Sequence, residues 1–300
     1  MIILYMLFIQ QSFSVVYPKD KLYKSLQIRE KKMNQRVEKK TLRSFGRVNW
    51  LGLWTLISRE VRRFLKVWQQ TIFGPIVTSL LFLFVFSVAI GKTRPEIGGL
   101  PFVNFLAPGL IMMVVLQNSF ANTSSSIVSA KVQGVIIDIL MPPLNSIEVT
   151  TGYALGGIAR GILLAIIGFF IISLFTNFTI HNIFITFFFA VMGSLMMALI
   201  GISGGLWAEK FDHMGTITNF IITPMTFLSG TFYSIKDLPD GVYQYAKFNP
   251  FFHAIDGFRY GITGYADSNI LFGGLFLFIL NIILFIICYS MISRGYKVKS

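Results

Sequence analysis

Six long apolar runs constrain the fold of this chain more than any other feature. They lie at about 71–91, 105–128, 153–176, 183–207, 215–233 and 268–292. A helix needs roughly 20 residues to cross the hydrocarbon core of a membrane. The runs are continuously apolar, whereas the strands of a membrane β-barrel alternate in polarity over about ten residues. The sequence therefore predicts an all-α integral membrane protein with six transmembrane helices.

The composition excludes an ordinary soluble protein. Of the 300 residues, 54% are hydrophobic and only 13% are charged, whereas about a quarter of a soluble chain is charged. The net charge of +13 is concentrated in the first 70 residues, which hold 15 Lys or Arg against four acids. Basic flanks beside membrane helices mark the cytoplasmic side. The charge therefore predicts orientation in a lipid bilayer, and we expect no nucleic-acid partner.

The same charge asymmetry predicts the topology. With six spans, both termini are cytoplasmic, and the basic tail at 293–300 lies on the same side as the loop at 130–151. The loop at 234–267 then faces outward. The single cysteine, Cys288, lies within the last run and can form no internal disulfide.

Residues 1–49 are predicted to be a basic, disordered N-terminal extension. The stretch 1–16 resembles a secretory signal, but no basic residue precedes its apolar part and no small-x-small cleavage site follows it. A second methionine follows, after which the chain has the composition of an ordinary cytoplasmic segment. We expect translation to start at Met33.

The segment 50–70 is predicted to form an amphipathic helix on the inner membrane surface. Its apolar residues, among them Trp54 and Trp68, repeat at alternating steps of four and three, while Arg59 and Arg62 occupy other faces. Tryptophan at headgroup depth and arginine toward anionic lipid are typical of a membrane anchor. A contact between the polar side and a cytoplasmic subunit is compatible with that role.

The loop at 130–151 contains a short amphipathic helix. Val135, Ile136, Ile139 and Leu140 lie three or four apart on one face, and Pro142 ends the helix. A short exposed helix of this kind needs a partner. We expect this helix to contact a cytoplasmic motor protein and to transmit its movement to the membrane spans.

Two sets of residues inside the spans have more than one interpretation. The second span carries a polar stripe made of Asn118, Asn122, Ser125 and Ser129. Such a stripe faces protein or water; hydrogen bonding between helices and the lining of a transport path or dimer interface both explain it. Arg160 is placed near the cytoplasmic end of the third span, where snorkelling to the headgroups is favoured over pairing with an acid.

The region before the last span is predicted to be irregular. Pro224 lies in the middle of the fifth run, which should therefore be kinked or broken. The segment that follows is too polar to cross the membrane and rich in aromatic residues. We expect two short re-entrant helices there, with Asp256 and Arg259 close enough to pair.

Taken together, these residues resemble the permease subunit of an ABC-2 type exporter, over nearly all of 50–292. The most specific match is in the C-terminal third, where these residues follow the family's order and spacing: Pro224, Phe227, Leu228, Ser229, Gly230, Phe232, Leu238, Pro239, Asn249, Pro250, Asp256, Arg259 and Gly264. A second match lies where the family places its coupling loop: Lys131, Gly134, Asp138, Leu140 and Pro142. The family often has glutamate where Asp138 stands.

The resemblance implies a bacterial inner-membrane permease that works with a second permease copy and separate cytoplasmic ATPase subunits. It would export amphipathic or hydrophobic molecules such as lipids, polysaccharides or drugs. ATP and magnesium would bind to the ATPase, so we expect no cofactor, metal or catalytic site in this chain. The residues implied for an outer gate are Pro224, Ser229, Gly230, Asn249, Pro250, Asp256 and Arg259.

Other functional classes remain as alternatives. An ion-gradient-driven transporter or channel needs binding groups near the membrane midplane, and the predicted span centres carry no ionisable residue, although neutral oxygens could bind sodium. A membrane hydrolase needs a nucleophile beside a base, but the three histidines fall in loops or at span ends. A structural scaffold is the third alternative. The sequence identifies neither the cargo nor whether the permease pairs with itself or with a sister chain.

Overall fold

The computed structural model describes residues 24, 27–29, 47–89, 91, 96–176 and 180–297. The chain divides into one unit of Met1–Arg47 and another of Val48–Ser300, and the fold described below belongs to the second unit. Most of the predicted extension at 1–49, including Met33, lies outside the described residues.

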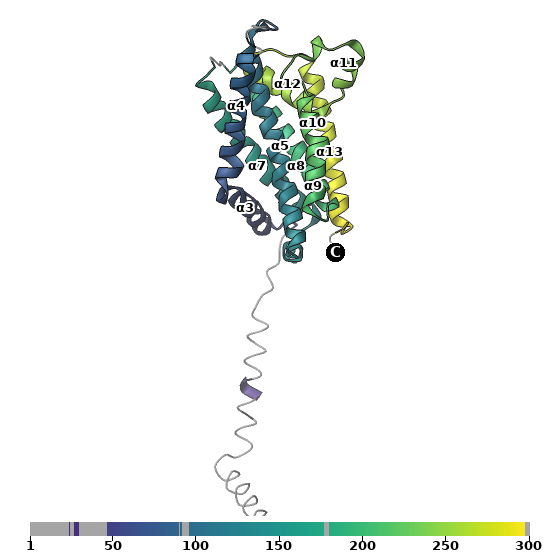
Figure 1. Cartoon of the computed structure of the whole chain (residues 1–300). Helices are drawn as coiled ribbons and strands as arrows, with labels where there is room; N and C mark the ends of the chain where they lie inside the picture. Colours follow the sequence, from purple (N-terminus) through teal and green to yellow (C-terminus); the bar gives the residue numbers. More distant parts are fainter. Residues whose placement is uncertain are drawn as a thin grey trace, which may run out of the picture. The chain divides into compact units, whose positions relative to one another are not determined.

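The second unit is a helix bundle. Five of its described helices are long and apolar enough to cross a membrane, and they run side by side in Figure 1. They are Gln69–Ala89, which joins the π-helical turn η1 (Gln69–Phe73) to α4 (Gly74–Ala89), α5 (Phe102–Val132), α7 (Ser146–Ser173), α8 (Ile183–Trp207) and α13 (Ile270–Ser293). They match the predicted spans except the fifth, and the chain is an integral membrane protein.

Helix α5 forms the centre of the bundle. Its middle turns are buried against α7, α8 and α4, and α12 covers part of the same helix. By contrast, α4 and α13 expose most of their apolar side chains. In a membrane protein such outer faces are covered by lipid or by another membrane chain.

The predicted fifth span does not form one long helix. The chain instead makes α9 (Phe211–Ile217), the π-helical turn η2 (Thr218–Ile222) and α10 (Thr223–Phe227), and then leaves helical geometry. Pro224 has no amide hydrogen to donate, and just before it the Thr223 amide donates to the carbonyl of Thr218 in the wider π pattern. The predicted irregularity is found at this proline. The number of six membrane-spanning segments stays a prediction.

The segment before the last span contains the two short helices that were predicted. They are α11 (Asp240–Ala246) and α12 (Pro250–Thr263), preceded by the 3-10 turn η3 (Ile235–Asp237). Almost every residue of α12 is buried by the bundle. Their entry into the membrane stays a prediction.

In the part of the chain that the structure describes, a small hairpin departs from the all-α expectation. Strand β1 (Glu96–Ile97) pairs antiparallel with β2 (Leu100–Pro101), so that Glu96 lies opposite Pro101. The turn between them is Gly98-Gly99, and both glycines have positive φ, as a tight hairpin turn requires.

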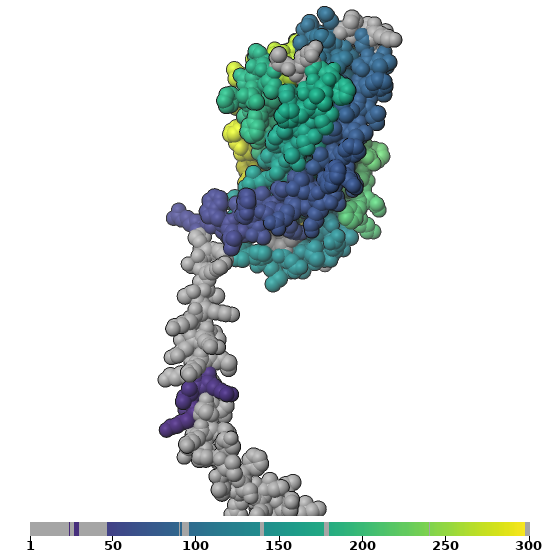
Figure 2. All heavy atoms as spheres, turned by 90° about the vertical axis from the view of Figure 1, so that its left-hand side faces the viewer, coloured from purple at the N-terminus to yellow at the C-terminus, as the bar shows by residue number. Residues whose placement is uncertain are grey.

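Helix α3 (Trp50–Lys66) crosses one end of the bundle (Figure 2), opposite the end that carries α11 and α12 (Figure 1). Its inner face packs on α7, where two glycines allow close approach. A Cβ atom on Gly152 would lie 2.5 Å from Leu56 Cδ2, and one on Gly156 would lie 2.6 Å from Glu60 Cβ. The helix is therefore docked on the bundle as well as exposed toward its surroundings.

Replacing Gly156 with leucine should push α3 away from α7. Forcing a side chain into a filled contact costs about 1–3 kcal/mol, so the midpoint of thermal unfolding of the purified protein should fall. Gly215 in α9 is the matched control, because a Cβ atom there meets no atom within 4 Å. An equal effect of leucine at both positions would contradict the packing role of Gly156.

Candidate functional site

The predicted coupling loop lies at the same end of the bundle as α3 (Figure 1). A turn with Gly134 at φ +72° leads into the one-turn helix α6 (Ile136–Leu140). Ile136 packs inward, whereas Ile137 is 61% exposed and Met141 is 76% exposed. This surface thus presents apolar side chains to a partner.

Polar and proline residues complete that surface. Asp138 and Pro142 are exposed. Leu140 ends α6, and its side chain is outside the described set. A carboxylate surrounded by exposed apolar groups can recognise a basic and apolar protein surface.

Lys131 contacts the bundle itself. Its Nζ donates hydrogen bonds to the carbonyls of Leu206 at 2.8 Å and Ala208 at 2.6 Å, where α8 ends. A lysine at this position satisfies carbonyls that the helix end leaves free. Lys131 was predicted as part of the coupling loop. It thus attaches the start of this loop to the end of α8 and does not belong to the exposed surface.

One carboxylate joins the coupling loop to two helices. Glu148 is 7% exposed; its Oε1 accepts from the backbone amide of Asn49 at 2.6 Å, and its Oε2 accepts from that of Asn145 at 2.7 Å. Asn49 and Asn145 are the N-caps of α3 and α7. The Asn49 side chain also donates to the carbonyl of Pro143 at 3.2 Å. Loop, α3 and α7 are therefore held together at one point.

Helix α3 also bonds to the polar stripe of α5. Arg63 donates to the Asn122 side-chain oxygen at 3.0 Å and to Ser125 Oγ at 3.2 Å. Glu60, which is fully buried, accepts from Ser126 Oγ at 2.7 Å and pairs with Arg63 at 3.3 Å. Hydrogen bonding between helices thus accounts for this part of the stripe.

The remaining stripe residues are also bonded within the chain. Asn118 accepts from Arg160, and Ser129 accepts from Gln133 at 3.0 Å. Asn122 is fully buried, so it lines no open path in this conformation. A role of the stripe in a transport path or dimer interface stays a prediction.

Arg160 is not where the sequence placed it. The capping box of Asn145 and Glu148 starts α7 at Ser146, earlier than predicted, so Arg160 lies halfway along the helix. It is 7% exposed and donates to the Asn118 side-chain oxygen at 2.6 Å and to the Thr71 carbonyl at 3.4 Å. Pairing with an acid is therefore wrong among the described residues, whereas snorkelling to the headgroups stays a prediction.

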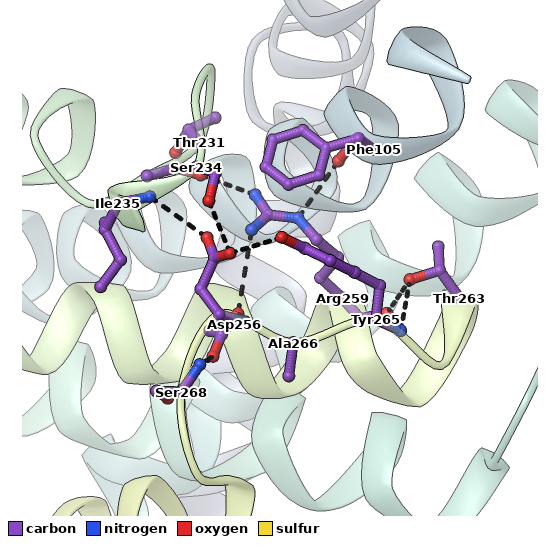
Figure 3. A network of polar contacts seen from close by, with 12 residues as sticks. Phe105, Thr231, Ser234, Ile235, Asp256, Arg259, Thr263, Tyr265, Ala266 and Ser268 are labelled. Atoms are coloured by element: carbon purple, nitrogen blue, oxygen red, sulfur yellow. Dashed lines mark hydrogen bonds and ion pairs between the residues drawn. The ribbon is translucent and has the colours of Figure 1, made fainter. Parts of the chain in front are cut away.

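The end of the bundle that carries α11 and α12 is organised around a buried arginine (Figure 3). Arg259 is fully buried; its Nη2 donates to the Gly230 carbonyl at 2.7 Å, and its Nε donates to the Phe105 carbonyl at 3.2 Å. The guanidinium also lies 3.9 Å from the centre of the Phe105 ring. Gly230 has φ +70°, which favours glycine. Arg259 therefore joins α5, α12 and the loop after α10.

Two buried carboxylates balance this charge. Asp256 lies 4.0 Å from Arg259 Nη1 and accepts from the Asp267 amide at 2.8 Å and from the amide and hydroxyl of Ser268. Asp267 accepts from Ser234 Oγ at 2.6 Å and Tyr265 Oη at 2.8 Å. The predicted proximity of Asp256 and Arg259 is confirmed, although each bonds mainly to other groups.

The other residues of the predicted outer gate adjoin this network. Asn249 caps α12 through the Phe251 amide at 3.0 Å, and its side chain donates to the Met225 carbonyl at 3.4 Å. Pro250 is the first residue of α12, and Pro224 is the second residue of α10. The buried Ser229 hydroxyl donates to the Thr226 carbonyl. The sequence signature thus gathers at one end of the bundle.

The predicted interfacial residues face outward from α3. Trp54 is 68% exposed, Trp68 is 53% exposed, and Arg59 and Arg62 are exposed as well. Phe64, four residues before Trp68 in the same apolar repeat, is instead buried against the bundle. The anchor face is therefore narrower than the apolar pattern indicated.

The three histidines lie apart from one another in the fold. His181 packs on Tyr260, His213 packs on Trp207, and His253 is buried with its Nε2 2.7 Å from the Lys247 carbonyl. They do not form the paired nucleophile and base that a hydrolase requires.

The C-terminal end of α13 is tied to the loop after α8. Lys297 donates to Glu209 at 2.8 Å. This hydrogen bond lowers the pKa of the Glu209 carboxyl and raises the pKa of the Lys297 ammonium. Both side chains are solvent-accessible, so the pair is a weak contact.

Sequence comparison gives an independent line of evidence. A family model described as ABC-2 type transporter matches residues 52–263. The inner membrane transport permease YadH of Escherichia coli (strain K12) is 34% identical over 253 residues, which are 84% of this chain and 98% of that protein. Nodulation protein J of Rhizobium leguminosarum bv. viciae is 27% identical over 238 residues, which are 75% of this chain and 86% of that protein.

Proposed function

Because this chain belongs to the ABC-2 type transporter permeases, we propose that it forms the export path of an ABC transporter driven by a separate cytoplasmic ATPase. The main support for an ATPase docking site is the exposed surface around Asp138. Glu148 connects the loop that bears this surface to both α3 and α7. A push on this surface would be transmitted to two helices at once. ATP and magnesium would act on the ATPase subunit.

The distribution of charge supports the orientation that we propose. Arg59, Arg62, Lys131 and Lys297 gather at the end of the bundle that holds α3 and α6. By the positive-inside rule this end is cytoplasmic, as are both termini. The name of the Escherichia coli relative supports the inner membrane as the location.

We propose that the run Phe211–Phe227 serves as the sixth membrane segment. It continues as helix through η2 despite Pro224, and it stands among the long helices in Figure 1. Broken helices are tolerated in membranes where neighbouring helices satisfy the backbone. Here the Asn249 side chain bonds to the Met225 carbonyl.

We propose the substrate class from the family resemblance, because the sequence itself does not identify the cargo. That class is an amphipathic or hydrophobic molecule such as a lipid, polysaccharide or drug-like compound. We further propose that two copies of the permease work together, a feature that the family resemblance supports. The polar stripe adds no argument for this pairing, because Asn118 and Asn122 bond within the chain.

The alternative of ion-gradient-driven transport has to account for Arg160. This residue puts a charge halfway along α7, contrary to the expectation that span centres are free of ionisable groups. Arginine keeps its proton at any physiological pH, so it cannot carry protons in a cycle. Proton coupling therefore gains no support from it.

Replacing Asp138 with lysine should uncouple the permease from its ATPase. The side chain is exposed, so the variant should insert and fold normally, while the reversed charge repels a basic docking surface. The measurement is co-purification of the tagged permease with its ATPase, followed by ATP hydrolysis with and without permease. We expect loss of the ATPase from the variant by about tenfold or more, given that rim like-charge contacts cost several kcal/mol.

Gly230→Leu is the matched control at the opposite end. Its positive φ makes any side chain strained, so the outer network should be damaged while the ATPase stays bound. Normal transport and ATPase binding by Asp138→Lys would remove the docking role of this surface. Loss of the ATPase from Gly230→Leu would contradict the separation of the two ends.

A further inference from the structure

Arg160 carries a buried positive charge without a matching acid. Among the described residues, no carboxylate lies within ion-pair distance of it, and its hydrogen-bond acceptors are the neutral oxygens of Asn118 and Thr71. A second guanidinium, that of Arg63, bonds to the next turn of the same polar stripe. The nearby acid, Glu60, is already paired with Arg63. Among the described residues, the charge of Arg160 is therefore not balanced by an acid.

Such an imbalance is costly inside a membrane protein. A buried charge that is not paired loses most of its favourable solvation, and two like charges in a medium of low polarity repel each other. Bacterial membranes offer a partner of opposite sign in the phosphate groups of their lipids. An anion at this place would restore the balance.

Unused hydrogen-bond donors lie at the same place. Arg160 Nε and Asn122 Nδ2 are buried and have no partner among the described residues. Asn122 Nδ2 lies 3.6 Å from the position of a Cβ on Gly156, which is one helical turn from Arg160 on α7. Both donors therefore belong to the seam between α5 and α7. Orphaned donors of this kind call for an acceptor.

The seam also has a charged rim. Arg63 keeps 32% of its side chain exposed at the edge of α3, and Arg59 and Arg62 lie on exposed faces of the same helix. Together with the exposed Trp54 and Trp68, these arginines mark α3 as a surface that meets lipid headgroups. An anion reaching the seam would first meet this rim.

We propose that Arg160, Asn122 and Arg63 bind a phosphate group between α3, α5 and α7, supplied by the headgroup of a membrane phospholipid. Arg160 Nε and Asn122 Nδ2 donate to phosphate oxygens, and the two guanidiniums neutralise the charge. This inference goes beyond the proposed function, since it requires no ATPase and no transport.

Native mass spectrometry of the full chain in detergent tests the site. The probes are phosphatidylglycerol and a neutral glucosyl diacylglycerol, which has no phosphate. The wild type should retain phosphatidylglycerol preferentially, and Arg160→Gln should weaken this binding by about 10- to 100-fold, the value of one charged hydrogen-bond contact. Lys236→Gln, which removes a half-exposed cation at the opposite end of the bundle, should leave the binding unchanged.

Asn118→Asp is a second variant that should fold in any case. It has the same shape and places a carboxylate 2.6 Å from Arg160, so it supplies the missing charge from within. This variant should lose the preference for phosphatidylglycerol and melt at the same or a higher temperature.

Inorganic phosphate separates the two sources of the ligand. If phosphate raises the melting temperature of the wild type but not of Arg160→Gln, and no lipid preference is found, the phosphate site stands and its ligand is a free anion. If the wild type, Arg160→Gln and Asn118→Asp bind phosphatidylglycerol equally and phosphate stabilises none of them, the proposal is wrong. Arg160 would then only hold α5, α7 and η1 together through its hydrogen bonds to Asn118 and Thr71.

Discussion

Replacing Arg259 with methionine should lower the free energy of unfolding by about 3–5 kcal/mol, the usual cost of breaking a buried ion pair. The change leaves Asp256 without its cation and removes the donors to the carbonyls of Phe105 and Gly230. All of these groups are buried in the polar network around Arg259. Denaturant titration of the reconstituted protein measures the loss.

Lys236→Met is the control for this experiment. Lys236 lies 3.8 Å from Asp267 in the same network, but 51% of its side chain is exposed, so its loss should cost less than about 1 kcal/mol. Combining Arg259→Met with Asp256→Asn should cost less than the sum of the two single changes, since the pair is coupled. Equal, small effects of Arg259→Met and Lys236→Met would show that the polar contacts around Arg259 do not stabilise the end of the bundle that carries α11 and α12.

Replacing Glu148 with alanine should destabilise the protein by about 2–4 kcal/mol, because two backbone amides lose a charged acceptor. The amides of Asn49 and Asn145 start α3 and α7, so both helices lose a cap at once. We also expect the bound ATPase to hydrolyse ATP with less transport per cycle. Thermal unfolding and a transport assay in liposomes measure the two effects.

Glu209→Ala is the matched control, because that carboxylate is exposed and bonds only to Lys297 among the described residues. It should change stability by less than about 1 kcal/mol. Glu148→Gln should lie between the two variants, since it keeps the shape of the side chain and one acceptor oxygen. A Glu148→Ala variant as stable and as active as the wild type would contradict the joint role of this residue.

The overall architecture could be predicted because it follows from local patterns. Continuous apolar runs correspond to helices at α4, α5, α7, α8 and α13, and Pro224 marks the place where helical bonding changes. Helix ends were less predictable. The start of α7 was missed by seven residues, although the capping box Asn145-x-x-Glu148 is readable in the sequence.

The contacts of the site could be predicted only where the spacing of two side chains along a helix indicates that they meet. The spacing of Asp256 and Arg259 predicted that they lie close together, and the structure shows this. The acceptors of Arg259, however, are backbone carbonyls of Phe105 and Gly230, which no side-chain pattern reveals. The docking of α3 was missed for a similar reason, since Glu60 and Arg63 resemble surface charges in a helical pattern but bond to α5.

Site-specific crosslinking tests the central claim, that a cytoplasmic ATPase docks on the surface around Asp138. The native Cys288 is buried, so a cysteine introduced for Ile137, which is 61% exposed, offers an accessible thiol for a crosslinker. Val242→Cys in α11, at the opposite end of the bundle (Figure 1), is the control. Such docking predicts that the cysteine at position 137 crosslinks to the ATPase in an ATP-dependent manner and that the one at position 242 does not. Crosslinking at position 242, or none at position 137 in an active complex, would contradict it.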